Sequence, residues 1–183
     1  LALLENRFEQ NVLDATDDWH LDVVDASDLA GVPTSVCEMA AATAREAGQG
    51  GWRFTLKAPS YVPFMKFAKN RSLRERMYHA YVTRASEMGP GEGRWDNSEV
   101  MVNILRLRRQ MASLLGYDNF AEYAMETRMA TSVAEVDQFL SDLVARARGH
   151  AEDELQALVI FAEETDDVCD LQAWDLAFYA ERL

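Results

Sequence analysis

Three histidines, His20, His79 and His150, are the residues of this chain best suited to metal binding or proton transfer. Glu75 and His79 lie four positions apart, so a helix would place them on one face, where a third ligand could complete a metal site. Such pairs are also common on solvated helices, and this is the interpretation we favour. His20 and His150 lie in acidic surroundings, where we expect surface residues rather than general bases.

Other signatures of chemistry are weak. The chain contains no G-x-S-x-G, Walker A or G-x-G-x-x-G motif, and the glycine-rich loop at 89–93 lacks the lysine and strand-helix context of a phosphate site. Five aspartates between residues 14 and 25 lack the loop glycine and final glutamate of an EF-hand, which favours a solvated acidic face over a calcium site. These are Asp14, Asp17, Asp18, Asp22 and Asp25.

The composition indicates a globular protein and limits its partners. About half of the 183 residues are apolar, and 31 acidic against 18 basic residues give a net charge of −13. This charge would repel nucleic acid and anionic membrane surfaces, so we expect neither as a partner. No apolar run approaches the length that crosses a bilayer. Cys37 and Cys169 lie far apart without C-x-x-C spacing, which favours a reducing, cytoplasmic setting without disulfides.

The hydrophobic periodicity predicts a mostly α-helical fold. Asn70 is a plausible N-cap for one helix, and capping-box spacing at 35–38 and 132–135 predicts the start of two others. The clearest amphipathic helix follows residue 97, with apolar residues at Val100, Ile104, Leu107, Met111, Leu114 and Leu115. The last long helix contains Gly149, where a bend and a break are both possible.

Residues 52–56 give the only convincing strand pattern, since aromatic and β-branched residues alternate there with polar ones. No partner strand is evident, so we expect at most one short strand or extended segment.

Both ends of the chain lie within predicted helices, which indicates a fragment of a larger protein. We expect one helical region over 1–183, with possible sub-parts 1–68 and 69–183. Helices that normally pack against a missing part would expose apolar faces, so the isolated fragment is expected to self-associate through them.

Five stretches, in order along the chain, carry a resemblance to a known family. They are residues 8–16 (FEQNVLDAT), 59–63 (PSYVP), 83–86 with 95–98 (TRAS and WDNS), 114–117 (LLGY) and 174–181 (WDLAFYAE). Together they resemble the thimet-oligopeptidase-like family of zinc metallopeptidases, and most closely its bacterial oligopeptidase A branch.

The resemblance implies that this chain is a multi-helix lobe of a zincin-like oligopeptidase, a helical enzyme whose deep channel admits short, unstructured peptides in the cytoplasm. In that family two histidines of H-E-x-x-H and a later glutamate bind zinc, and the glutamate of the motif activates water. None of these matches a position here. The chain alone is therefore expected to bind no catalytic zinc and to cleave no peptide.

The segment near the carboxyl end offers three candidates for lining the peptide channel, Phe178, Tyr179 and Arg182. Core packing explains the two aromatic residues better, since together with Trp174 they have helical spacing. Two alternatives remain for the parent protein. One is the dipeptidyl carboxypeptidase branch of the family, although the Gly-Pro-Gly loop before residues 95–98 favours the endopeptidase branch. The other is a non-catalytic helical interaction module, which peptide cleavage by the natural full-length product would exclude.

Overall fold

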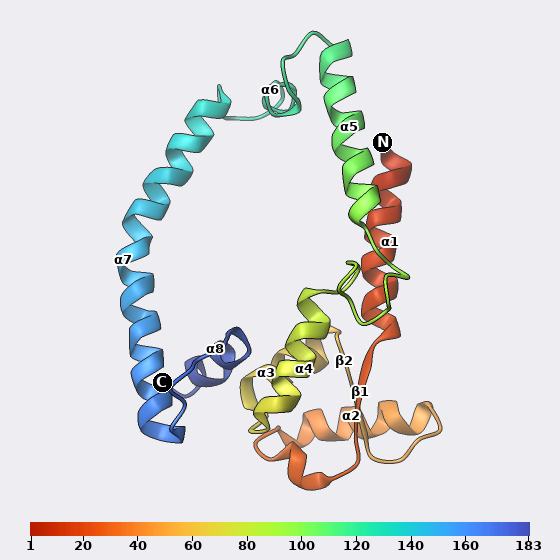
Figure 1. The fold of residues 1–183 in the computed structure, drawn as a ribbon, viewed down its shortest axis with the longest axis vertical. Helices are drawn as coiled ribbons and strands as arrows, with labels where there is room; N and C mark the ends of the chain where they lie inside the picture. Colours follow the sequence, from red (N-terminus) through yellow and green to blue (C-terminus); the bar gives the residue numbers. More distant parts are fainter. The chain divides into compact units, whose positions relative to one another are not determined.

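The computed structural model describes residues 1–183 and contains eight α-helices, one short 3₁₀-helix and two β-strands (Figure 1). The predicted mostly α-helical class is confirmed. In chain order the elements are α1 (Ala2–Asp18), β1 (His20–Val23), η1 (Ala26–Leu29), α2 (Thr34–Glu46), β2 (Trp52–Thr55), α3 (Ala58–Phe67), α4 (Arg71–Val82), α5 (Ser98–Leu114), α6 (Phe120–Met125), α7 (Val133–Asp166) and α8 (Ala173–Ala180). No helix is both long enough and apolar enough to cross a membrane.

The chain forms two compact units. One comprises residues 1–8 and 98–157, and the other comprises residues 9–97 and 158–183. Helices α1 and α7 contribute residues to both. The second unit contains the sheet, α2, α3, α4 and α8.

The predicted strand has a partner, so the expectation of at most one strand is wrong. Strand β2 pairs antiparallel with β1, and Leu21 lies opposite Phe54. Leu21 and Phe54 are buried, while the Asp22 carboxylate accepts two hydrogen bonds from Arg53 on the other strand, at 2.7 and 2.8 Å. The sequence pattern does not predict the short β1, because this strand closely follows an acidic helix and shows only two alternations of polar and apolar residues.

The core of the unit formed by 9–97 and 158–183 lies between the two strands and helices α2, α3 and α4. Phe54 and Phe64 meet edge to face with ring centroids 4.7 Å apart. Fully burying a side chain of this size contributes about 1.5–3 kcal/mol. Trp174 and Ala177 of α8 pack against the same core, so α8 is anchored to helices that precede it by about a hundred residues.

The helix starts follow the predicted caps only in part. The Asn70 side chain accepts from the Leu73 amide at 3.2 Å, as predicted for the start of α4. Ser132 likewise accepts from the amide of Glu135 at 3.1 Å, and α7 then runs unbroken through residue 149, which excludes the break. The capping box at 35–38 is wrong. Helix α2 already begins at Thr34, with Pro33 at its N-cap and no side-chain cap. Ser35 therefore lies inside the helix.

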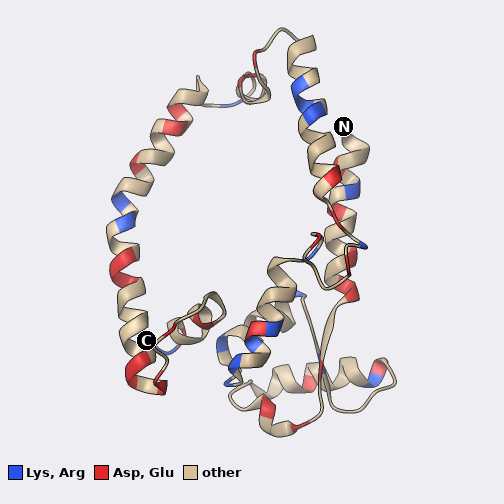
Figure 2. Ribbon diagram, in the orientation of Figure 1, with Lys and Arg blue, Asp and Glu red and all other residues tan.

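In the unit formed by 1–8 and 98–157, α5 lies beside the first turns of α1. Arg108 donates to the Glu5 carboxylate at 2.8 Å, and Val100 and Ile104 are buried. The part of α7 in this unit has little cover: Phe139 is 61% exposed and Leu140 is 51% exposed. Acidic residues recur along α7 (Figure 2).

Candidate functional site

The three candidate channel-lining residues lie together in the second unit. Phe178, Tyr179 and Arg182 line one pocket of about 520 Å³, here called the α8 pocket. Its other lining residues come from the end of α7 and from the α3–α4 junction: Lys69, Arg71, Arg74, Thr165, Asp166 and Val168. Figure 2 shows basic positions gathered where α3 meets α4.

The pocket rests on a buried ion pair that fixes α8. Asp175 has no exposed surface, and its carboxylate accepts from Arg74 Nη2 at 2.7 Å and from Arg71 Nη2 at 2.7 Å. Arg74, only 1% exposed, also donates to the Ala68 carbonyl at 2.7 Å. Two cations thus share one buried carboxylate, so the cluster keeps an excess positive charge.

The protonation of this cluster follows from its surroundings. Burial alone would raise the pKa of Asp175, but the hydrogen bonds from Arg71, Arg74 and the Gln172 amide outweigh burial and hold the pKa below its ordinary value. Burial likewise lowers the pKa of Arg74, although Asp175 opposes that shift. Because the pKa of an arginine side chain ordinarily lies far above neutral pH, Arg74 remains charged and the pair is ionic.

The two aromatic candidates belong to the core, and the third candidate is at the surface. Phe178 is 3% exposed and Tyr179 is 2% exposed, whereas Arg182 is exposed. The guanidinium carbons of Arg74 and Arg182 lie 3.9 and 3.3 Å from the Phe178 ring centroid. Such cation–π contacts orient guanidinium groups while leaving their N–H donors available. Contact with a ligand therefore falls mainly to the cations.

Tyr179 ties α8 to the end of α7. Its hydroxyl donates to Asp166 at 3.1 Å, and its ring meets Phe161 edge to face at 6.2 Å. Burial, together with the hydrogen bond to Asp166, raises the pKa of the Tyr179 hydroxyl, which stays protonated as a donor. Tyr179 thus holds one wall of the pocket rather than titrating within it.

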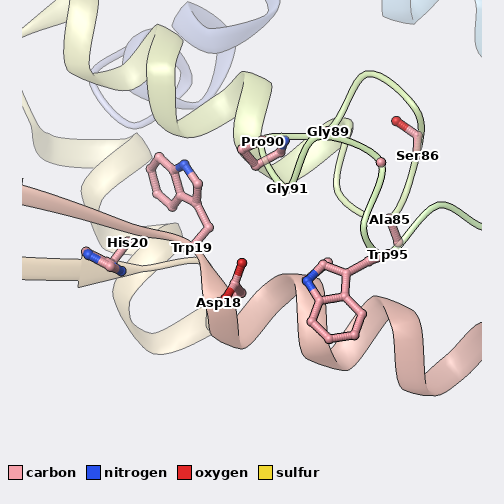
Figure 3. Close-up of a pocket in the computed structure, with 11 residues that line it drawn as sticks. Asp18, Trp19, His20, Ala85, Ser86, Gly89, Pro90, Gly91 and Trp95 are labelled. Atoms are coloured by element: carbon pink, nitrogen blue, oxygen red, sulfur yellow. The ribbon is translucent and has the colours of Figure 1, made fainter.

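A second pocket of about 180 Å³ lies where the end of α1 meets the glycine-rich loop. The side chains of Trp19 and Trp95 lie on either side of Asp18 (Figure 3). Arg94 contacts both elements, since its guanidinium lies 4.5 Å from the Trp95 ring centroid and 3.8 Å from the Asp18 carboxylate. This pocket gathers residues of two of the stretches that carry the family resemblance, but its chemistry points to no particular ligand.

The histidine and carboxylate candidates do not form a metal centre. His79 Nε2 lies 4.0 Å from Glu75 Oε1 on the exposed face of α4, and no third ligand joins them. No group of three or more His, Cys, Asp or Glu side chains is arranged to hold a metal ion. The residues present therefore do not fit a zinc site, and no catalytic step is assigned to them.

The five clustered aspartates point in different directions. Asp17 pairs with Lys57 at 3.0 Å, Asp22 pairs with Arg53, and Asp25 caps η1 through the Ser27 amide. Asp14 accepts from Gln10 at 2.7 Å. Each of these aspartates has its own partner, so together they do not form one ligand set.

Sequence reasoning missed most of the α8 pocket. Asp175 lies in one of the stretches that carry the resemblance. Its contacts with Arg71 and Arg74 could not be predicted, because these residues lie about a hundred positions away in the sequence. Nothing in a single sequence links residues so far apart. Lys69 was missed for the same reason.

Comparison with known proteins gives the chain its family. A model of peptidase family M3 matches residues 64–183. Oligopeptidase A of Haemophilus influenzae is 45% identical over 182 residues, which cover 100% of this chain and 27% of that protein. Oligopeptidase A of Escherichia coli is 46% identical with the same coverage. Dipeptidyl carboxypeptidase of Escherichia coli is 30% identical over 183 residues, 100% of this chain and 26% of that protein.

The chain thus spans about a quarter of the length of the curated relatives it matches. The resemblance inferred from the five short stretches is confirmed by a family model that covers well over half of the chain. On this ground, together with its likeness to oligopeptidase A, the chain belongs to peptidase family M3.

Proposed function

We propose that this chain is the helical, non-catalytic part of a zinc metalloendopeptidase of the oligopeptidase A type, which hydrolyses short peptides in the cytoplasm. The observation that carries the proposal is the 45–46% identity to bacterial proteins named oligopeptidase A across the whole chain. Identity to the dipeptidyl carboxypeptidase is lower, at 30%, which favours the endopeptidase branch. Two free cysteines are consistent with a reducing compartment.

The contribution of this chain would be structural. Its sequence has no H-E-x-x-H, so the zinc ligands and the glutamate that activates water would come from other parts of the parent protein. Arg182, just beyond the end of α8, lies at a surface backed by Phe178 and Tyr179, and we place this surface on the wall that contacts substrate peptides. The 183-residue chain alone would neither bind catalytic zinc nor cleave peptides.

The test uses the natural full-length product of the gene. Its translation should contain H-E-x-x-H on a predicted helix, and the purified protein should cleave a short peptide, lose activity with a chelator and regain it with zinc. A peptide with an amidated carboxyl end should still be cleaved, since a dipeptidyl carboxypeptidase requires the free end. The matched control is the 183-residue chain, for which no cleavage is expected.

A full-length product without the motif and without activity would overturn the proposal. It would leave the alternative of a non-catalytic helical interaction module. Cleavage of free-ended peptides only, in steps of two residues, would assign the protein to the dipeptidyl carboxypeptidase branch instead.

A further inference from the structure

We propose that the α8 pocket binds the carboxylate group of a peptide. The pocket is a local exception in a chain whose net charge is −13. Its lining contains four cations, Lys69, Arg71, Arg74 and Arg182, against one carboxylate, Asp166. The buried Asp175 and the nearby Asp170 offset part of this charge. A cavity wall with excess positive charge attracts an anion even when the whole molecule repels it.

Two of the four cations have no carboxylate partner in the protein. Arg71 and Arg74 are held by Asp175, but Lys69 and Arg182 make no ion pair. The main chain at Lys69 is fixed, because its amide donates to the Ala30 carbonyl at 2.8 Å and its own carbonyl accepts from Arg74 at 3.3 Å. The flexible Lys69 side chain therefore extends from a fixed point of the backbone.

Arg182 is prepared for a planar ligand. Its guanidinium stacks on the Phe178 ring at 3.3 Å, which restricts its rotamers without using its N–H groups. A guanidinium fork matches the two oxygens of a carboxylate, and charge-assisted hydrogen bonds of this kind are among the strongest in proteins. Less ordering of the side chain is then needed when the ligand arrives.

The dimensions of the pocket favour a group larger than a small ion. Its volume of about 520 Å³ lies in the range of organic ligand sites, and Val168 and Phe178 give it an apolar floor. An amino acid residue that bears a carboxylate fits both features. That the residue belongs to a peptide rests on the proposed function. The carboxylate can be the free carboxyl end or an Asp or Glu side chain, which share the same chemistry.

Isothermal titration calorimetry tests the site by measuring the affinity of the 183-residue chain for three forms of one short peptide. The forms have a free carboxyl end, an amidated end, and an amidated end with glutamate as the last residue. The free acid should bind, and the plain amide should bind at least about tenfold more weakly, the order expected for losing one charge-assisted contact. Binding of the glutamate amide would identify a side-chain carboxylate as a second source.

Matched variants locate the interaction. Lys69→Gln and Arg182→Gln should each weaken binding of the free acid about tenfold. Added salt should weaken binding of the free acid by the unaltered chain, because it screens the charges. Arg76→Gln is the control, because Arg76 is exposed on the same helix as Arg71 and lines a different pocket. Unfolding midpoints in urea should agree between Lys69→Gln and Arg76→Gln, because both variants leave the stack of Arg182 on Phe178 intact.

Equal affinity for the free acid and the plain amide would overturn the proposal, as would unaltered affinity in both Lys69→Gln and Arg182→Gln. These outcomes are separate from the fate of the proposed function, since no cleavage is measured. If the chain binds the free acid but the full-length product cleaves no peptide, the carboxylate site is supported and the proposed peptidase function is wrong. If the full-length product cleaves peptides but this chain shows no preference for a carboxylate, the peptidase function is supported and the carboxylate site is wrong.

Discussion

Asp175 carries the largest single residue effect that the structure predicts. Replacing it by asparagine, Asp175→Asn, leaves the guanidinium of Arg74 buried without its counter-charge. Breaking a buried pair from one side costs about 3–5 kcal/mol, because the remaining charge cannot return to water. Urea unfolding should show this loss in the free energy of unfolding.

The control for this substitution is Asp153→Asn, which makes the same chemical change on an exposed position of α7. It should alter the free energy of unfolding by less than about 0.5 kcal/mol. Equal effects of Asp153→Asn and Asp175→Asn would contradict the role assigned to the ion pair.

The Asp175 carboxylate also makes the free energy of unfolding depend on pH in the acidic range. The pKa of Asp175 is lower in the folded chain than in the unfolded one, where it is about 3.9, so the unfolded state binds the proton more readily. Its contribution is therefore fully present above pH 4 to 5 and is lost as the pH falls through the folded value. The difference in unfolding free energy between the unaltered chain and Asp175→Asn should shrink over this acid range. A difference that stays constant down to the lowest pH at which the chain is folded would show that the pKa is not depressed.

At the scale of elements, the two-stranded sheet depends on the backbone at Gly51. This residue has φ of +80°, and a Cβ built on it would lie 2.4 Å from the Val23 carbonyl oxygen at the end of β1. Gly51→Ala should destabilise the chain by more than about 2 kcal/mol, since left-handed strain alone costs roughly 1–2 kcal/mol and the contact adds to it. Urea unfolding measures the loss.

The neighbouring Gly50 gives the matched control, because its φ is not left-handed and a Cβ there meets nothing within 4 Å. Gly50→Ala should be neutral or stabilise by up to about 1 kcal/mol through the unfolded state. If both alanine variants behave alike, close packing at the start of β2 does not constrain this turn.

The elements that sequence could predict are those whose signals are local. Asn70 and Ser132 accept from the backbone amides three residues later, as their spacing predicts, and α5 follows a long apolar period. Strand β1 could not be predicted with equal ease, since four residues carry little periodicity and the pairing partner lies about thirty positions away. The predicted serine cap of α2 is absent, since Pro33 occupies the N-cap and no side chain caps this helix.

The candidate site, too, could be predicted only in part. The resemblance drew attention to Phe178, Tyr179 and Arg182, which the structure places around one pocket. Lys69 and the arginines of α4 could not be predicted as their neighbours, because packing of α8 on α3 and α4 brings them together. Contacts made by tertiary packing leave no periodic trace in one sequence.

At the scale of the whole molecule, two properties oppose each other. The net charge of −13 makes copies of the chain repel, and acidic positions recur along α7 (Figure 2), where most of them are exposed. Yet α7 also exposes a run of large apolar residues, namely Phe139, Leu140, Leu143 and Val144. Exposed apolar runs on a helix favour association with a matching surface, so the state of the isolated chain depends on how strongly its charge is screened.

We therefore expect the 183-residue chain to self-associate through this face of α7, and to do so more strongly at high salt, where repulsion between acidic copies is screened. Sedimentation velocity should show the average mass rising with protein concentration and with salt. The double variant Leu140→Glu with Leu143→Glu should remain monomeric, because it places charge in the apolar run. Leu13→Glu makes one such change at an exposed position of α1 and should associate as the unaltered chain does. A chain that sediments only as a monomer at high salt would contradict the expected association through these apolar residues.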